Sequence, residues 1–341
     1  MKDLSIIIVN FRSGKRLVKC LESLQRIEDS RFSFEVIVVD NHSNDGSQSQ
    51  LKLLFPQFTF LTNTENNGFA NGCNLGATYG RGTNLLFLNP DTTVNSDALF
   101  DMLEEVRVRP EYSIVTCSQV RENGSFDRPY GKFLTLFTLT GWLRTVDKIF
   151  TGGIEKSVTQ SKHYVYPDWV SGSVIMIRRA SFVRLGKWDD DFWMYYEDVD
   201  LCLRARNSGG EIVKLKKAVV GHVHGGSSRI NKEITAITKS EVHISRHLFI
   251  AKHETRESAF FMHLLLIFNN ILLGLLPALS GLVFFFVKQI NVQTHLYIRL
   301  VSYYFDVLRS GVWLSKRSVN YTAREEELVH RTLYPEYKKA R

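Results

Sequence analysis

Four short apolar runs, separated by segments with helical spacing, constrain the fold of this chain more than any other feature. Runs of this kind are typical of strands buried on both faces of a parallel sheet. Strand and helix alternate here at the rhythm of a doubly wound, mostly parallel α/β fold. The runs cover residues 4–9, 34–39, 58–61 and 85–88.

Polar side chains follow three of these runs, at Asn10, Asp40 and Asp91. Pro90 cannot donate to a sheet ladder, so the fourth strand ends before Asp91. If the strands are neighbours, the three polar groups line one crevice at the carboxyl edge, where open α/β sheets bind ligands. A carboxylate in that place suits a divalent cation and the phosphates it carries. The alternative is a simple turn at Asp91 that leads into a helix capped at Ser96.

Two loops at this edge contain residues suited to binding a nucleotide. Asp40 can accept the N–H of a pyrimidine base, although residues 40–46 are also rich in turn formers. Asn67 and Gly68 stand at the start of a helix that runs to about Tyr79. Glycine permits close backbone approach, and a helix start favours phosphate. An ordinary glycine-bearing loop is the alternative for this second segment.

Several classes of protein do not fit the sequence. Gly14 is the single glycine just after the first run, so a dinucleotide fingerprint is missing, and a P-loop would need a glycine at Val9. The net charge is +8, but no nucleic-acid-binding module is present, and we expect no nucleic-acid partner. The four cysteines are widely spaced and are expected to be buried thiols in a reducing compartment. The first apolar run is too short for a signal peptide.

A second group of candidate residues lies further along the chain. Residues 169–177 resume a strand pattern, and Trp169 and Gly172 are assigned to substrate binding, since small residues here let a sugar approach the backbone; a strand with a bulge is the alternative. Aromatic residues ending at Tyr196 precede Glu197 and Asp198, where a helix is expected to begin. The aromatics suit a wall for a sugar ring with Asp198 aimed into it. The helix dipole alone also favours acids there.

Asp40 after its strand, Asn67 and Gly68 at the helix start, and Asn89-Pro90-Asp91 together resemble the family 2 glycosyltransferases of GT-A fold, in particular bacterial rhamnosyltransferase-like members. The resemblance implies that Asp40 reads the base of a nucleotide-sugar. It implies that Asp91 ends a metal-binding Asp-x-Asp element for Mg²⁺ or Mn²⁺. Asn89 replaces the first carboxylate of that element, which leaves the cation with one fewer anionic ligand.

The same resemblance extends to the second group of residues. It implies that Asp198 of the Glu-Asp pair is the general base, with Tyr196 and Glu197 beside the substrate. It also implies a histidine before a Gly-Gly turn that helps to hold the metal or diphosphate, and the spacing favours His222 over His224. Two histidines without a further ligand do not favour zinc. Arg229 is assigned to substrate binding as a phosphate clamp, with a solvated loop arginine as the alternative.

The composition changes after the catalytic part. We therefore expect a nucleotide-sugar-binding catalytic domain over residues 1–229 and a helical region over 230–341. Residues 259–287 are almost continuously apolar, and a basic amphipathic helix is expected near 296–317. A single span conflicts with the positive-inside rule, so a re-entrant or interfacial helical pair is preferred. A soluble helical subdomain is the alternative.

These features and the resemblance together predict an inverting glycosyltransferase that moves a sugar from a nucleoside diphosphate to a hydroxyl of a lipid-linked saccharide. The resemblance alone implies rhamnose from dTDP-rhamnose as the first candidate donor. The expected place of the enzyme is the cytoplasmic face of the bacterial inner membrane, as a peripheral or monotopic protein of surface polysaccharide synthesis. A nucleotidyltransferase that makes nucleotide-sugars is one alternative, although residues 10–15 supply its glycine-rich basic loop poorly. A catalytically decayed, membrane-tethered sugar-binding protein is the other.

Overall fold

The structure is a computed structural model that describes residues 2–152, 158–223 and 231–326. The chain divides into two compact units. The first unit comprises Met1–Phe137, Trp142–Asp189 and Glu197–Ser227, and the second comprises Thr138–Gly141, Asp190–Tyr196 and Ser228–Arg341. Each unit is described by itself.

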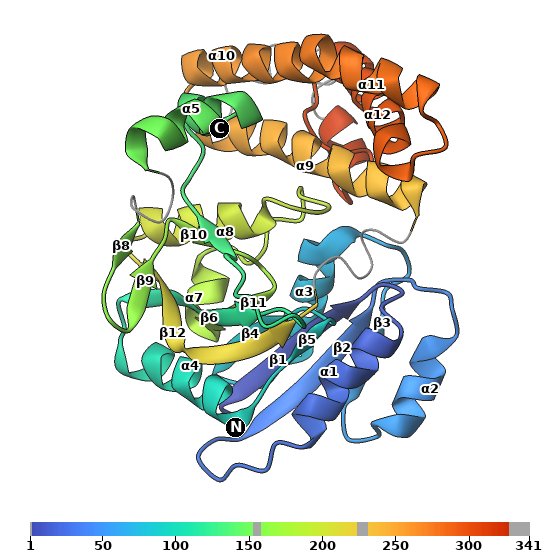
Figure 1. Cartoon of the computed structure of the whole chain (residues 1–341). Helices are drawn as coiled ribbons and strands as arrows, with labels where there is room; N and C mark the ends of the chain where they lie inside the picture. The colour runs from blue at the N-terminus through green and yellow to red at the C-terminus, as the bar shows by residue number, and fades with distance from the viewer. Residues whose placement is uncertain (1, 153–157, 224–230, 327–341) are drawn as a thin grey trace. The chain divides into compact units, whose positions relative to one another are not determined.

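The first unit is built on a mixed, mostly parallel sheet (Figure 1) with strand order β3-β2-β1-β4-β11-β6-β12-β9-β8, and β5 pairs with β12. Strands β3, β2, β1 and β4 run parallel, as do β6 and β12, whereas β11 is antiparallel to β4 and β6. The long strands are β1 Leu4–Asn10, β2 Phe34–Asp40, β3 Thr59–Thr62, β4 Asn84–Leu88, β6 Tyr112–Val120, β11 Val174–Arg178 and β12 Glu211–His222. The short strands are β5 Thr92–Thr93, β8 Thr159–Gln160 and β9 Tyr164–Tyr166, while β7 Tyr130–Gly131 and β10 Trp169–Val170 form a separate pair.

Helices cover both faces of this sheet because alternate residues of each strand point to opposite faces. Ile6 and Ile8 of β1 belong to one core cluster, with apolar residues of α1 and α4. Ile7 and Val9 belong to the other, with residues of α3, α7 and α8. The helices of this unit are α1 Lys15–Gln25, α2 Ser47–Leu54, α3 Gly68–Tyr79, α4 Ser96–Val108, α5 Gly141–Thr151, α7 Arg179–Arg184 and α8 Glu197–Asn207, with a 3₁₀ turn at Leu136–Thr138.

Glycines bring α3 close to the sheet. A Cβ atom on Gly72 would lie 2.8 Å from Val9 Cγ1, and one on Gly76 would lie 2.5 Å from Ile7 Cγ2. Real Cβ atoms do not approach carbon atoms so closely, so glycine is what lets this helix pack directly on β1. These two glycines therefore contribute to packing.

The α/β fold is confirmed, with differences at two places. Residues 169–177 form two strands of different sheets, β10 and β11, because residues 171–173 turn between them. The cap of α4 is Asn95, whose side chain accepts from Ala98 N at 2.8 Å, and not Ser96. The four cysteines are buried and form no disulfide, as expected.

The second unit is helical. Its helices are α9 Lys232–His253, α10 Arg256–Ile267, the π-helical turn Phe268–Leu273, α11 Gly274–Val283 and α12 Lys288–Ser310. The expected helical pair is wrong: residues 256–283 form one helical run that passes through Asn270 and Pro277, since the π-helical turn absorbs the irregularity. The amphipathic helix begins earlier than expected, at Lys288. It ends before Gly311, a residue that adopts the left-handed conformation.

The apolar faces of these helices differ in exposure. On α12, Leu300, Tyr304 and Val307 pack into the core of the second unit, so this face does not meet an external surface as expected. The most apolar 18-residue window of the run Arg256–Val283 has a mean hydropathy of 2.1, and 17% of that window is buried. By length and composition it is the one helix among the described residues that could cross a membrane.

Candidate active site

A compact polar cluster stands at the carboxyl ends of β1 and β2. These parallel strands pair Asn10 with Asp40 in register, which places both side chains at the same edge. Asp40 Oδ1 accepts from Asn10 Nδ2 at 2.8 Å and from Ser43 Oγ at 2.5 Å, and Asp40 Oδ2 accepts from Ser43 N at 3.1 Å. Asp40 is 5% exposed. The carboxylate is therefore fixed in orientation, with lone pairs left for a further donor.

The loop before α3 lies beside this cluster. Asn41 Nδ2 donates to Asn66 Oδ1 and to the carbonyl of Gly68, each at 2.9 Å. Gly68 begins α3 with a φ of 87°, a left-handed conformation that favours glycine. Asn67 precedes it and makes no side-chain capping bond to the helix. The asparagines thus connect this helix start to the end of β2.

Asp91 and His222 meet on the other side of this edge. The end of β12 pairs with β5, and Val223 N donates to the carbonyl of Asp91 at 2.9 Å. Asp91 Oδ1 lies 3.2 Å from His222 Nε2, and these side chains are 12% and 4% exposed, respectively. On the opposite side of the ring, His222 Nδ1 lies 2.7 Å from Gln119 Oε1.

This arrangement suits a divalent cation. An amide oxygen can only accept, so the contact with Gln119 places a ring proton on Nδ1, and in the neutral ring the lone pair of Nε2 then faces Asp91. A lone pair and a carboxylate oxygen 3.2 Å apart repel unless a proton or a cation lies between them. Metal-binding histidines commonly donate their other N–H to such a partner. Among the described residues no group of three or more His, Cys, Asp or Glu side chains could hold a metal ion, so phosphates and water would have to complete the coordination.

Ser173 and Gln119 connect the Asp91–His222 pair to Asn89, the residue that follows β4. Gln119 Nε2 donates to Ser173 Oγ at 2.8 Å, and the backbone N–H of Asn89 donates to the carbonyl of Ser173 at 2.9 Å. Thr92 Oγ1 donates to the carbonyl of Asn89 at 2.7 Å and holds the turn that presents Asp91. Gln119 and Ser173 are buried, so their polar groups satisfy one another.

Asp198 lies next to the same turn. Its Oδ2 accepts from Gly172 N at 2.9 Å, and its Oδ1 accepts from Val199 N at 2.8 Å. A Cβ atom on Gly172 would lie 3.2 Å from Phe69 and 3.7 Å from Asp198. Adjacent residues, Gly172 and Ser173, therefore connect Asp198 to the Gln119–His222–Asp91 network.

The two neighbouring acids of α8 differ in environment. Burial raises the pKa of Glu197 well above its ordinary value, and the charge of Asp198 raises that pKa further. Burial also raises the pKa of Asp198, but the amides of Gly172 and Val199 oppose this effect. Glu197 is 6% exposed, and its Oε2 has no hydrogen-bond partner. Of the two, Asp198 is the one whose ionised form is supported by donors.

The remaining predicted site residues lie in other surroundings. Trp169 Nε1 donates to the carbonyl of Lys132 at 2.8 Å, and its ring covers Gly131, so the tryptophan holds the β7–β10 pair. Tyr196 belongs to the second unit, where Arg246 Nε donates to its hydroxyl at 2.9 Å, and it has a φ of 66°. His224 and Arg229 lie outside the described residues.

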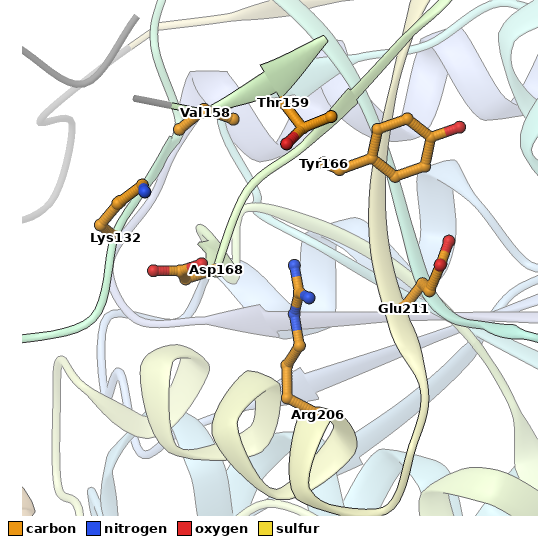
Figure 2. A pocket seen from close by; sticks show the side chains of 7 residues that line it. All are labelled: Lys132, Val158, Thr159, Tyr166, Asp168, Arg206 and Glu211. Carbon is orange, nitrogen blue, oxygen red and sulfur yellow. The ribbon is translucent and has the colours of Figure 1, made fainter. Parts of the chain in front are cut away.

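A separate cavity of about 440 Å³ opens near the start of β12 (Figure 2). Arg206 extends from the end of α8 into it, with Lys132 and Asp168 on one side and Glu211 on the other. Glu211 is the first residue of β12 and His222 the last, so the length of the strand separates this cavity from the Asp91–His222 pair.

Comparison with known proteins decides the family. The model of glycosyl transferase family 2 matches residues 5–174, a stretch that includes Asp40, the start of α3 and Asp91. The chain belongs to glycosyl transferase family 2. It is therefore a glycosyltransferase. The rhamnosyltransferase-like resemblance is supported by two relatives at low identity, the rhamnosyltransferase WbbL of Escherichia coli at 27% and an L-rhamnosyltransferase of Mycobacterium tuberculosis at 23%.

One relative of this glycosyltransferase is the low-salt glycan biosynthesis hexosyltransferase Agl10 of Haloferax volcanii, which is 27% identical over 66% of this chain and 67% of that protein. Another is the N-acetylglucosaminyl-diphospho-decaprenol L-rhamnosyltransferase of Mycobacterium tuberculosis, which is 23% identical over 64% of this chain and 75% of that protein. A crystal structure of GalNAc-T7 with UDP, GalNAc and Mn²⁺ matches 75% of this chain and 51% of that one, with a TM-score of 0.51 and 13% identity. That last likeness shows the fold alone.

Three residues of the glycosyltransferase site were not among the predicted ones. Ser43 donates to Asp40, and Gln119 and Ser173 carry the network between His222 and Asn89. The sequence does not single out Gln119, because β6 also contains the polar residues Ser113, Thr116 and Ser118. Ser43 is hidden in a loop of turn formers, where a serine is expected for local reasons.

Proposed function

We propose that this protein is an inverting glycosyltransferase that moves a sugar from a nucleoside diphosphate to a hydroxyl of a lipid-linked saccharide. The observation that carries the proposal is the path of hydrogen bonds from Asp198 through residues 172–173 and Gln119 to His222, whose Nε2 faces Asp91 at 3.2 Å. This path connects a candidate base to a candidate diphosphate site, although the residues are far apart in the sequence.

Asp198 is the general base of this proposal. Its ionised carboxylate removes the proton of the acceptor hydroxyl as the oxygen attacks the anomeric carbon, and the nucleoside diphosphate leaves from the opposite face of the sugar. The amides of Gly172 and Val199 hold the carboxylate in one orientation, which lowers the cost of aligning it with the acceptor. Glu197 stays neutral because it is buried beside Asp198.

The donor is held at the other end of the path. Asp40, fixed by Asn10 and Ser43, accepts the N–H of a pyrimidine base. Asp91 and His222 would hold Mg²⁺ or Mn²⁺, which supplies positive charge to the leaving diphosphate. Gln119 keeps His222 in the tautomer that this role requires.

Rhamnose from dTDP-rhamnose is the first candidate donor, and a lipid-linked saccharide of bacterial surface polysaccharide (O-antigen or capsule) synthesis is the candidate acceptor. The name of the mycobacterial relative supports both choices, because it describes an L-rhamnosyltransferase and a diphospho-decaprenol substrate.

The second unit would hold the protein at the cytoplasmic face of the inner membrane. Many large apolar side chains of the run Arg256–Val283 are exposed, among them Phe261, Leu272 and Leu276 at 60%, 57% and 75%. Such a surface on a single helix is typical of a segment that contacts lipid.

The test is to incubate the full chain with a panel of nucleotide-sugars and a short lipid-linked acceptor, and to measure release of the nucleoside diphosphate. We expect acceptor-dependent release from one donor, with dTDP-rhamnose as the first candidate, and an inverted anomeric configuration in the product. Loss of release in Asp198→Asn but not in Asp97→Asn, an exposed acid in the first turn of α4, would locate the base. No release from any donor would contradict the proposal.

A further inference from the structure

A cavity of about 430 Å³ lies between the first turns of α1 and the segment around Asp91. Ser13, Lys15 and Arg16 line one side, and Asp91 and Thr92 line another. The basic residues that line this cavity belong neither to the Asn89-Pro90-Asp91 segment, which is proposed to hold the metal, nor to the Asn10–Asp40 cluster, which is proposed to read the base.

Ser13 is a buried polar group without a partner. It is 7% exposed, and its hydroxyl oxygen makes no hydrogen bond. Its backbone N–H donates to Asn10 Oδ1 at 3.2 Å, so the position of Ser13 is fixed beside the Asn10–Asp40 cluster. An unsatisfied buried hydroxyl is costly, and its presence in a cavity points to a ligand that completes the bond.

The start of α1 favours an anion. No side chain caps this helix and no acid stands in its first turn, so the positive end of the helix dipole is uncompensated at Lys15, a residue that lines the cavity. Lys15, Arg16 and Lys19 also line the cavity, and the structure gives none of them a carboxylate partner among the described residues. Asp91 and Glu122 are the carboxylates that face them.

We propose that Ser13, the N-terminus of α1, Lys15 and Arg16 form a subsite for the diphosphate of the nucleotide-sugar donor. This inference rests on the proposed function. It assigns the phosphates of the donor to protein groups in addition to Asp91 and His222. The donor is favoured over a lipid-linked diphosphate because Ser13 is bonded to Asn10, which in turn holds Asp40, so one ligand reaches both the base-reading group and the cavity.

The subsite compensates for the asparagine at position 89. With Asn89 in place of a carboxylate, a cation at Asp91 has one fewer anionic ligand. Fixed cations on α1 supply positive charge to the phosphates without a metal. Donor binding is therefore expected to persist, at reduced affinity, when divalent cations are removed.

Calorimetric titration of the full chain tests this, with dTDP and inorganic pyrophosphate as probes and EDTA present. We expect the double variant Lys15→Ala, Arg16→Ala to weaken binding of both probes on the order of tenfold or more, since it removes charge-assisted bonds to phosphate. Ser13→Ala is expected to weaken dTDP binding severalfold without lowering the melting temperature. Lys52→Ala, which removes an exposed charge from α2 outside the cavity, is the matched control and should leave affinity unchanged.

The outcomes separate this inference from the proposed function. Unchanged dTDP affinity in both variants would overturn the subsite, and so would an effect on farnesyl diphosphate in place of dTDP, which would assign the cavity to the acceptor. If pyrophosphate and dTDP binding depend on these residues but no nucleotide-sugar is consumed, the subsite stands and the proposed reaction fails.

Discussion

At the scale of single residues, the chemistry of this site depends on how neighbouring groups fix each carboxylate. Asp40 is held by Asn10 and Ser43, and Asp198 by the backbone of Gly172 and Val199. Asp91 faces a histidine whose tautomer is set by Gln119. Each acid thus has its own surroundings, and the differences between these surroundings allow similar side chains to have different roles.

The pH dependence of activity follows from the environment of Asp198. Burial raises the pKa of this carboxyl, and only the ionised form can accept a proton. We expect kcat/KM to fall on the acid side with an apparent pKa above the ordinary aspartate value of about 3.9. A pH–rate profile, with recovery of activity on return to neutral pH, measures this. An acid limb at or below that ordinary value would contradict the assignment.

Gln119 is expected to act through His222 as a positioning residue. Gln119→Leu removes the acceptor of the ring N–H and should weaken Mn²⁺ binding on the order of 10- to 100-fold, whereas Gln119→Glu keeps an acceptor and should retain it. Electron paramagnetic resonance titration with Mn²⁺ in the presence of dTDP measures the affinity. Equal Mn²⁺ affinity in the two variants would argue against the role.

Several of these residues can be found from sequence because they follow apolar runs. Asn10 and Asp40 are the last residues of β1 and β2, and Asp91 follows β4, so the topology of a parallel sheet gathers them at one edge. Gln119 and Ser173 could not be assigned in this way. Their roles depend on a contact across β6 and the turn before β11, which no local pattern reports.

At the scale of elements, the strands are well predicted and the connections are not. The apolar runs of β1, β2 and β4 have the composition of buried strands, and their bounds differ from expectation by at most one residue at an end. The strands of the segment 169–177 are harder to predict, since Gly172 lies between two strands that belong to different sheets. Periodicity does not distinguish a bulge in one strand from a change of sheet.

The helix α3 offers a test of how its glycines act. Gly76→Ala places a Cβ atom 2.5 Å from Ile7, so the helix must move away from β1 at a cost of about 1–3 kcal/mol in free energy of unfolding. Gly141→Ala is the matched control, because nothing lies within 4 Å of its added atom. Urea denaturation measures both. Equal stability of the two variants would show that α3 does not need these glycines for packing.

At the scale of the whole molecule, the chain combines an α/β unit that carries the candidate site with a helical unit that carries an exposed apolar run. Composition predicted a change near residue 229, an apolar membrane-associating segment over residues 259–287 and a basic amphipathic helix near 296–317. The pattern of α12 is amphipathic, yet its apolar face serves the core of the second unit. The exposed apolar surface lies instead along residues 256–283.

Membrane association is expected to depend on that run. Leu272→Gln with Leu276→Gln removes apolar area from exposed positions and should reduce flotation with anionic phospholipid vesicles severalfold, without a loss of thermal stability. Leu308→Gln, at an 82% exposed position on α12, is the matched control and should float like the unmodified protein. Equal flotation of all three would contradict an interfacial role for residues 256–283.

The most direct test of the central claim is a paired measurement on Asp198→Asn, of sugar transfer and of dTDP affinity. The account predicts that transfer falls about 10²- to 10⁴-fold while the dissociation constant for dTDP stays within about twofold, because the base is removed and the diphosphate site is left intact. Transfer close to that of the unmodified enzyme, or a parallel loss of dTDP binding, would contradict it.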